Sequence, residues 1–476
     1  MKYFNYLMIA TAAAASLLAL LWPGNTVWLG DEADLLNLAL DANEAGVPAG
    51  RGLQGSVSVF YGALVVWLNQ ILLKITFNPV AIAGIKSALS IAAAWPALRL
   101  LAGEFRIPVG FGAALYFASP FVFFYIRQPW DNVWLMPLGL WFAVFMAKFL
   151  RAGSWRTCAG AALTAAAMFY LHPVSTAVPA GFALGVLVFR RPLRPALIRC
   201  AVSAGGALIL LAPYLRRCWL DFAPLPAERP PFGSGLIAGG FAFRNLTGLG
   251  FPERFSPASG AGLWWVLLAA AGLAIAFFAL LGVVAVVHRM RRKEELSTFD
   301  RATGCAILTA LCHMLLLATL RLEAYPHYNS AVVFAWLLIA WRGFTAFSGD
   351  FPRAGRRIAA AALLLEFGFL VNFTAVVERE CGGGTDFFGC TLGRQWQIAR
   401  NLWAARCANP DLQVELEVER LRTDPRPLQA LIRLARRTPL PPAEPYRQAL
   451  LLPSRQGSGF DLLLLDRLAP RPEENR

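Results

Sequence analysis

Charged side chains are scarce in this sequence of 476 residues, in which Asp, Glu, Lys and Arg together make up only 15%. Zinc-ligand spacings, Gly-rich phosphate-binding loops and nucleic-acid-binding motifs are absent. A hydrophobic share of 57% and a mean hydropathy of +0.52 describe a bilayer-embedded chain. The net charge of +15 comes from Arg and Lys gathered in short loops between apolar runs. We therefore expect a polytopic membrane protein and no nucleic-acid partner.

The first apolar run is not followed by a small-residue cleavage site, so we interpret it as a retained helix rather than a signal peptide. A membrane-spanning helix must cross ~30 Å of hydrocarbon. Apolar runs that could do so occupy residues 5–22, 57–76, 79–101, 109–127, 131–150, 157–171, 174–189, 200–215, 262–287, 303–320, 327–342 and 357–377.

Basic loops set the expected orientation, because Lys and Arg concentrate on the cytoplasmic side. These loops are 151–156, 190–199, 288–301 and 342–357. Alternation then places Asp31 and Asp131 outside, yet three apolar runs separate them. The run 57–76 carries Asn69, Gln70 and Lys74, so we expect it to lie in the membrane interface. The prediction is an all-α protein with about eleven spanning helices plus one interfacial helix.

The composition changes after residue 377, which divides the chain into a transmembrane catalytic domain (1–377) and a small extracytoplasmic α/β domain (378–476). Within the second, we expect strands at 412–418, 449–452 and 460–465 around a helix at 428–436. Cys381 and Cys390 are the most plausible disulfide in an oxidising outer compartment. Free thiols remain an equal alternative, because sequence does not choose the pairing.

Polar clusters converge on the expected outer face, each at the end of an apolar run. They are Asp31-Glu32-Ala33-Asp34, Arg127-Gln128-Pro129-Trp130-Asp131-Asn132, Leu171-His172-Pro173, and Arg321-Leu322-Glu323-Ala324-Tyr325-Pro326-His327-Tyr328. Carboxylates in such positions can act as general bases or hold a metal, and the cations can bind an anionic headgroup. We expect residues 30–56 to be a polar loop that forms the floor of an active site.

These clusters, in this order and on one side, resemble the GT-C class of polyprenyl-phosphate-sugar-dependent membrane glycosyltransferases. That class includes the protein O-mannosyltransferases and the aminoarabinose transferases that modify lipid A. The likeness covers about residues 5 to 342. It is carried by the acidic Gly30-Asp31-Glu32-Ala33 after the first helix, by Asp131-Asn132 after the run that ends at Arg127, and by Tyr325-Pro326-His327-Tyr328.

The resemblance implies an inverting hexosyl- or pentosyltransferase of the bacterial inner membrane, with its site on the periplasmic side. Asp31 or Glu32 would deprotonate the acceptor, or hold a divalent metal that does so, and Asp131 would complete the acidic site. The residues expected at the donor phosphate are Arg127, Arg321, His327, Tyr328 and Lys86, and those expected to line the site are Asn132, His172 and Glu323. Asp34 and Asp41 are expected to tolerate Asn.

The sequence leaves alternatives open. The acceptor can be a lipid, a glycan or a protein, and membrane lipids are the other partners. A transporter or flippase would use buried charges such as Lys86 and Asp131 as a substrate or proton path, although no inverted repeat of hydropathy is evident. A phosphoethanolamine-type transferase or an O-antigen ligase or polymerase is a further alternative.

Overall fold

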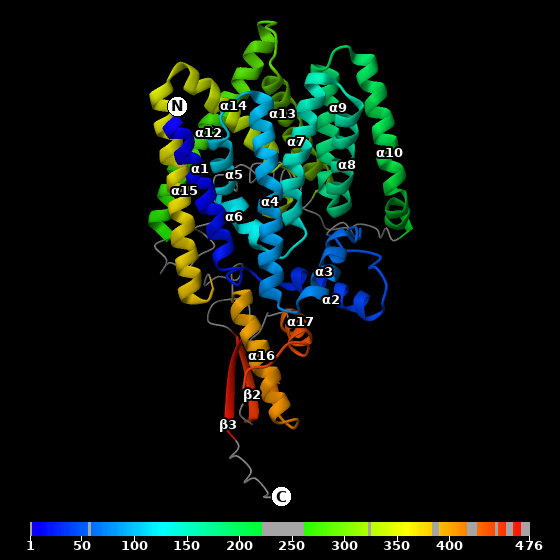
Figure 1. The fold of residues 1–476 in the computed structure, drawn as a ribbon, viewed down its shortest axis with the longest axis vertical. Helices are drawn as coiled ribbons and strands as arrows, with labels where there is room; N and C mark the ends of the chain where they lie inside the picture. Colours follow the sequence, from blue (N-terminus) through cyan, green and yellow to red (C-terminus); the bar gives the residue numbers. More distant parts are fainter. Residues whose placement is uncertain are drawn as a thin grey trace, which may run out of the picture.

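The computed structural model describes residues 2–55, 59–220, 261–321, 325–382, 390–416, 426–442, 446–453 and 460–467. Most of these residues form long helices bundled along the long axis of the molecule (Figure 1). The bundle helices are α1 (Lys2–Leu21), α4 (Pro79–Phe105), α5 (Gly110–Phe117), α6 (Pro120–Arg127), α7 (Leu135–Ala152), α8 (Trp155–Leu171), α9 (Ala177–Phe189), α10 (Leu193–Leu220), α12 (Ala261–Arg291), α13 (Thr298–Leu320), α14 (Val333–Asp350) and α15 (Pro352–Glu380). Three short 3-10 helices connect them: η1 (Asn132–Trp134), η2 (Pro173–Thr176) and η5 (Pro326–Val332).

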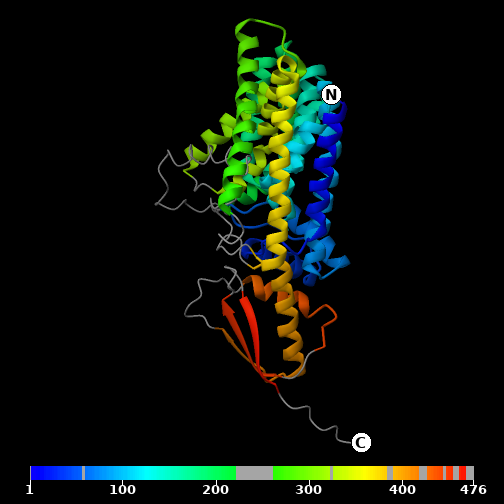
Figure 2. The same cartoon turned by 90° about the vertical axis from the view of Figure 1, so that its left-hand side faces the viewer.

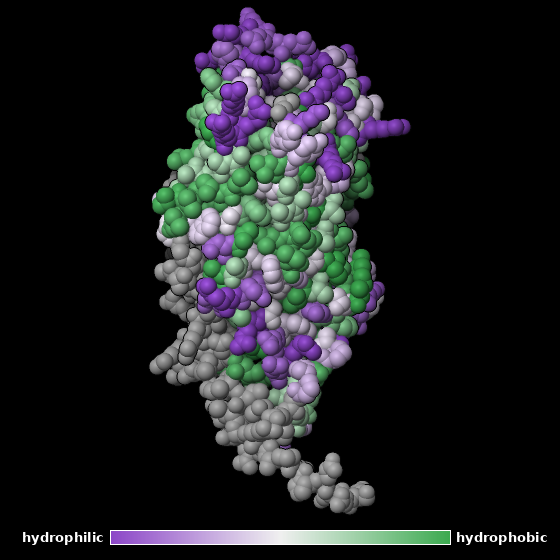
Figure 3. Space-filling model, turned by 60° about the vertical axis from the view of Figure 1, so that its left-hand side comes forward, coloured by the Kyte–Doolittle hydropathy of each residue, from purple (hydrophilic) through white to green (hydrophobic). Residues whose placement is uncertain are grey.

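The protein is an all-α polytopic membrane protein. Eight of the described helices are long and apolar enough to cross a membrane, or nine if α5 and α6, which meet at a 60° bend, form one broken span. Figure 3 shows a hydrophobic band across the face of the bundle that it presents, with hydrophilic surface above and below it. Counting α8 and α9, which have 17 and 13 residues, would reach the expected total of about eleven. That total stays a prediction.

The basic connections gather at the end of the bundle that carries the N-terminus (Figure 1). At this end Arg151 forms a salt bridge of 2.7 Å with Glu104, and the Arg190 guanidinium donates to the Leu150 carbonyl. Asp300, fully buried at the start of α13, accepts from Arg342 at 2.7 Å and from Arg289 at 2.9 Å. The clustering agrees with the positive-inside pattern of the sequence, while the side of the membrane stays a prediction.

Two glycines set the close packing of α12 and α14. A Cβ atom at Gly343 would lie 1.7 Å from the Phe278 carbonyl oxygen, and one at Gly282 would lie 2.0 Å from the Ile339 carbonyl oxygen. Each position therefore excludes a side chain. Small residues at helix contacts let backbones approach closely, which is a main source of attraction between helices in lipid.

The expectation that residues 30–56 form a loop is wrong for the first part of this segment. Residues Gly30–Glu44 form helix α2, because Leu35, Leu36, Ala39 and Leu40 recur at helical spacing and are buried together. In the described part of the run 57–76, residues 59–76, the helix is the 12-residue α3 (Leu64–Ile75). At 1.5 Å per residue α3 is about 18 Å long, too short to cross the hydrocarbon. Both helices lie at the end of the bundle away from the N-terminus (Figure 1).

The C-terminal part extends beyond this same end (Figures 1 and 2). It contains helices α16 (Leu392–Ala408) and α17 (Arg426–Ala435) and strands β1 (Gln413–Leu416), β2 (Tyr446–Pro453) and β3 (Phe460–Arg467). The sheet order is β1-β2-β3, with β1 parallel to β2 and β2 antiparallel to β3. These elements coincide with the helix and the strands expected there. That this part is a separate domain stays a prediction.

Cys381 and Cys390 lie where the chain leaves α15 and approaches α16. The Thr391 N–H donates to the Cys381 carbonyl at 3.0 Å, and Gly382 pairs with Cys390 in a β-bridge. Both side chains are thiols in this structure. A disulfide between them stays a prediction.

Candidate active site

Glu32 is the buried member of the acidic segment, with only 2% of its surface exposed. It lies in the first turn of α2, and its Oε2 atom accepts a hydrogen bond of 3.0 Å from the Leu29 N–H. A carboxylate is favoured in this position because the first backbone N–H groups of a helix lack partners within the helix. Asp31, the preceding residue, is only partly buried, and part of its side chain stays exposed.

Lys86 anchors the segment that carries Asp131. Its ammonium, fully buried on α4, donates to the Pro129 carbonyl at 2.9 Å. The neighbouring Ser87 hydroxyl donates to the Ile126 carbonyl at 3.0 Å. These bonds tie the end of α6 and the following turn to α4, and they bring Asp131, 3% exposed, to the same place as Lys86. Asp131 and Glu32 both act electrostatically on the Lys86 ammonium.

The cluster perturbs its own carboxyl groups. Burial raises the pKa of Glu32 to about 8, and the Asp31 and Asp131 carboxylates add to the effect. Loss of hydration also raises the pKa of Asp31, with Asp34 adding to the shift and Arg426 opposing it. A carboxyl that titrates near neutral pH is suited to general acid–base catalysis. Asp31 and Asp131 therefore both act on Glu32, the most buried of the three expected catalytic carboxylates.

An aromatic wall stands beside the carboxylates. The His172 ring lies 4.4 Å from the ring of Tyr61 and 5.6 Å from that of Tyr328, and the His327 ring lies 4.5 Å from Tyr328 and 4.6 Å from Trp130. Asp131 and Asp31 act electrostatically on Tyr61, which places this wall next to the acidic group. His172, Tyr328 and His327 are thus gathered as the sequence predicted.

The remaining expected site residues are not shown to join this group. Arg127 is 2% exposed and donates to the Trp22 carbonyl at 2.8 Å, with Glu378 as its electrostatic partner, so it joins α6 to the ends of α1 and α15. Arg321 ends α13 in a left-handed conformation, with an exposed side chain. Asn132 begins η1. Glu323 lies outside the described residues.

No protein-family model and no curated protein matches this sequence. The site is therefore interpreted from its own geometry.

The donor set does not fit a bound metal ion. Among the described residues no three His, Cys, Asp or Glu side chains are grouped closely enough to hold one. Asp31, Glu32 and Asp131 interact through their charges without forming such a set. The chemistry of the cluster is accordingly that of carboxylates, a buried cation and neutral hydrogen-bond donors.

Two cavities flank α8 and α10 and share lining residues. The larger, about 890 Å³, lies between α3, α8 and α10 and reaches the backbone of Gly50. The second, about 330 Å³, lies among α7, α8, α9 and α10 and has an almost entirely apolar lining. Ala166 and Leu211 line both. Arg216 and Arg217 line the larger one, so the cavity next to the apolar one has two cations at its wall.

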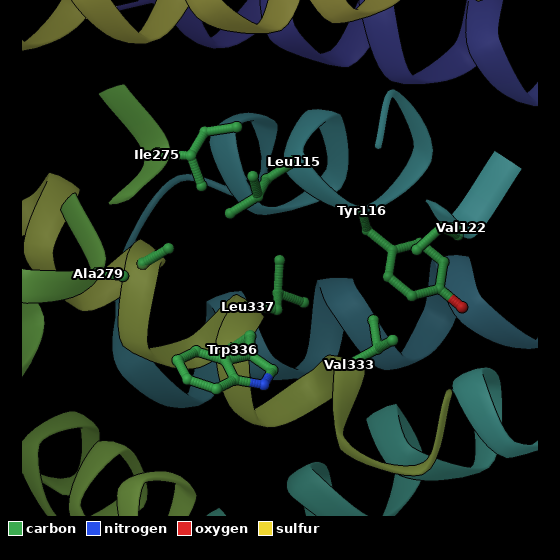
Figure 4. Close-up of a pocket in the computed structure, with 9 residues that line it drawn as sticks. Leu115, Tyr116, Val122, Ile275, Ala279, Val333, Trp336 and Leu337 are labelled. Carbon is green, nitrogen blue, oxygen red and sulfur yellow. The ribbon is translucent and has the colours of Figure 1, made fainter. Parts of the chain in front are cut away.

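A third cavity has no comparable chemistry. It measures about 20 Å³, room for about one water. Figure 4 shows Leu115, Ile275, Val333 and Leu337 around it, with the Tyr116 ring at its edge. We interpret it as a packing gap between α5, α12 and α14.

Helix α17 clamps the acidic helix α2 from the C-terminal side. Arg433 pairs with Asp41 at 2.7 Å and donates to the Asn37 amide oxygen at 3.0 Å, and Arg426 pairs with Asp34 at 2.8 Å. Asp34 and Asp41 take part in this clamp, so replacing either of them would also change the contact with α17. That both tolerate Asn stays a prediction.

The sequence interpretation missed several of these residues. Tyr61 lies within the apolar run 57–76, and Arg216 directly follows the run 200–215. No sequence pattern marks either residue as functional. Glu366 had a signal, a lone carboxylate in the apolar run 357–377. It is fully buried halfway along α15, and neither carboxyl oxygen has a hydrogen-bond partner among the described residues.

Proposed function

We propose that the protein is an integral membrane glycosyltransferase that moves a sugar, with inversion, from a polyprenyl-phosphate donor to a lipid, glycan or protein acceptor outside the cytoplasm. The proposal rests mainly on one observation: Glu32, Asp131 and Lys86 are buried together at the end of a membrane bundle. Buried charges at such a depth are costly and are retained mostly where they are used.

The reaction needs few groups. The acceptor hydroxyl oxygen forms a bond to the anomeric carbon, and the bond from that carbon to the phosphate oxygen breaks. The hydroxyl proton passes to the Glu32 carboxylate, and the polyprenyl phosphate leaves with the bonding electrons. Glu32 suits this role because a base is most effective when its pKa is near the working pH. Lys86 supplies positive charge where negative charge develops, which is usually the largest contribution to such catalysis.

The cavities beside α8 and α10 support a lipid donor. A polyprenyl chain is apolar and long, and the 330 Å³ cavity is lined mainly by alanine, leucine and phenylalanine side chains. The phosphate would lie toward the wider cavity, where Arg216 and Arg217 can approach it. We therefore assign Arg216 to the donor phosphate in place of Arg127, because Arg127 is buried and does not line this cavity. Arg217 lies beside Arg216, although its guanidinium also donates to the Gly50 carbonyl.

A transporter or flippase is the second candidate, and Glu366 is the observation that favours it. Carboxylates in the middle of a membrane helix are typical of proton and ion paths. The two functions make different demands on the protein, since transport needs Glu366 and sugar transfer needs Glu32.

Mass spectrometry of envelope glycans, lipids and glycoproteins tests the proposal, using a deletion strain that re-expresses the wild type, Glu32→Gln or Glu366→Gln. We expect a hexose or pentose unit to disappear on deletion, to return with the wild type and Glu366→Gln, and to stay absent with Glu32→Gln. Full restoration by Glu32→Gln, or an unchanged glycan profile on deletion, would contradict the proposal.

A further inference from the structure

The backbone pair 52–55 and 59–62 holds Tyr61 at the edge of the acidic cluster. The Gly52 N–H donates to the Tyr61 carbonyl at 2.8 Å, and the Tyr61 N–H donates to the Leu53 carbonyl at 2.7 Å. The ring lies over Gly55, where an added Cβ would come within 2.5 Å of it. Tyr61 is therefore fixed by backbone bonds on both sides and by a glycine that leaves room for its ring.

His172 is fixed as firmly, and its hydrogen bonds define its tautomer. Its carbonyl accepts from the Ser175 hydroxyl at 2.6 Å, and its Nδ1 atom accepts from the Val174 N–H at 3.3 Å. Burial lowers the pKa of His172 well below its ordinary value, with His327 and His313 adding to the effect, so the ring is neutral. A neutral imidazole whose Nδ1 accepts must carry its proton on Nε2.

The Nε2 atom lies 2.9 Å from the Tyr61 hydroxyl oxygen. With the proton on Nε2, His172 donates and the Tyr61 oxygen accepts. The hydroxyl proton of Tyr61 is then directed away from His172. Burial raises the pKa of Tyr61 well above its ordinary value, so the group keeps this proton and acts as a donor rather than a base.

We propose that the Tyr61 hydroxyl donates a hydrogen bond to a phosphate oxygen of the lipid-linked substrate, and that His172 is the positioning residue that aims it. The proposal rests on the proposed function for its substrate. It adds a neutral donor to the charge of Lys86, whose ammonium already donates to the Pro129 carbonyl. Donors fixed before the reaction need no reorganisation when charge develops on the leaving group.

Steady-state sugar transfer by the full-length protein in lipid nanodiscs tests the proposal through a double-mutant cycle. We expect Tyr61→Phe to lower kcat about 10²-fold, as loss of one such donor does elsewhere, and His172→Ala to lower it similarly. The double variant should be no slower than either single one, because both remove the same bond. His172→Gln, which keeps an N–H donor, should recover part of the loss. Tyr116→Phe, a buried tyrosine outside the site, is the matched control and should keep the wild-type rate.

Binding gives a second readout that does not depend on turnover. Farnesyl phosphate should bind the wild type about tenfold more tightly than it binds Tyr61→Phe, whereas farnesol should bind both equally. Wild-type turnover by Tyr61→Phe, multiplicative effects in the double variant, or equal binding of farnesyl phosphate would overturn the inference. If the wild type transfers no sugar yet binds farnesyl phosphate through Tyr61, the inference stands and the proposed reaction fails.

Discussion

Replacing Glu32 by Gln is the sharpest perturbation of the cluster. Gln keeps the size of the side chain and an oxygen that can accept from the Leu29 N–H, so α2 should still form. Only the basic oxygen is lost. Removal of a general base typically slows a reaction about 10²–10⁴-fold, which is about 3–5 kcal/mol of barrier.

The raised pKa of Glu32 predicts a pH profile as well. With a pKa of about 8, the carboxyl is ionised in only about one molecule in ten at pH 7. Because the ionised form is the base, the wild-type rate should rise about tenfold between about pH 7 and pH 9 and then level off. Initial rates of sugar transfer between pH 6 and pH 9.5 measure this rise.

Stability should change in the opposite direction. The pKa of Glu32 is about 8 in the folded protein and near 4.5 in the unfolded chain, so the folded state binds the proton more tightly. Stability is therefore lost as the pH rises from about 4.5 toward 8, and the Gln variant should lack this component. Glu294→Gln, an exposed glutamate at the opposite end of the bundle, should match the wild type in rate and stability. A rate independent of pH in this window, together with an active Glu32→Gln variant, would refute the assignment of the base.

Three further predictions concern the scaffold. Arg433→Ala should loosen α17 from α2 and lower the free energy of unfolding by about 1 kcal/mol, since the ion pairs of Arg433 are partly exposed. Thermal unfolding and limited proteolysis of the C-terminal part measure this loss, and no change in either would mean that the clamp does not contribute to stability. Glu366→Met should raise the melting temperature, because a buried carboxyl without hydrogen-bond partners among the described residues lowers stability by about 1–3 kcal/mol. A lower melting temperature would show that the carboxyl group has hydrogen-bond partners in the membrane. A cysteine that replaces the exposed Val47 should react with an impermeant maleimide in intact cells, whereas one that replaces the exposed Glu295 should react only after permeabilisation. The reverse pattern would contradict the proposed orientation.

The helical bundle could be predicted from the sequence because its signal is local. Long apolar runs must bury their backbone polar groups inside helices when they enter lipid, so hydropathy alone predicts most of them. The basic loops beside α7, α9 and α12 are equally local, and the structure places them at one end. The short α8 and α9, whose length is marginal for a span, are where this signal weakens and the count of spans becomes uncertain.

The acidic residues of the candidate site were found for a similar reason. Glu32 and Asp131 each follow an apolar run, and carboxylates in such positions are conspicuous in a chain with few charges. The sequence did not predict helix α2, because its charged first turn resembles a loop. The leucines on its other face indicate a helix only when it is known that a partner surface buries them. The polar face of α2 also has its partner far along the chain, since Asp41 pairs with Arg433 of α17, roughly 390 residues later.

What the sequence determined by itself is the class of protein and the places where charge meets the membrane, since both depend on residues that are neighbours in the chain. Tertiary structure alone decided which charges share one site. Lys86 and Arg127 are both cations in or beside apolar runs, yet packing brings Lys86 to Glu32 and Asp131 and commits Arg127 to Trp22. The bond between Tyr61 and His172 spans 111 residues. Such pairings follow from how helices pack and cross, and a pattern read along one chain carries no information about that geometry.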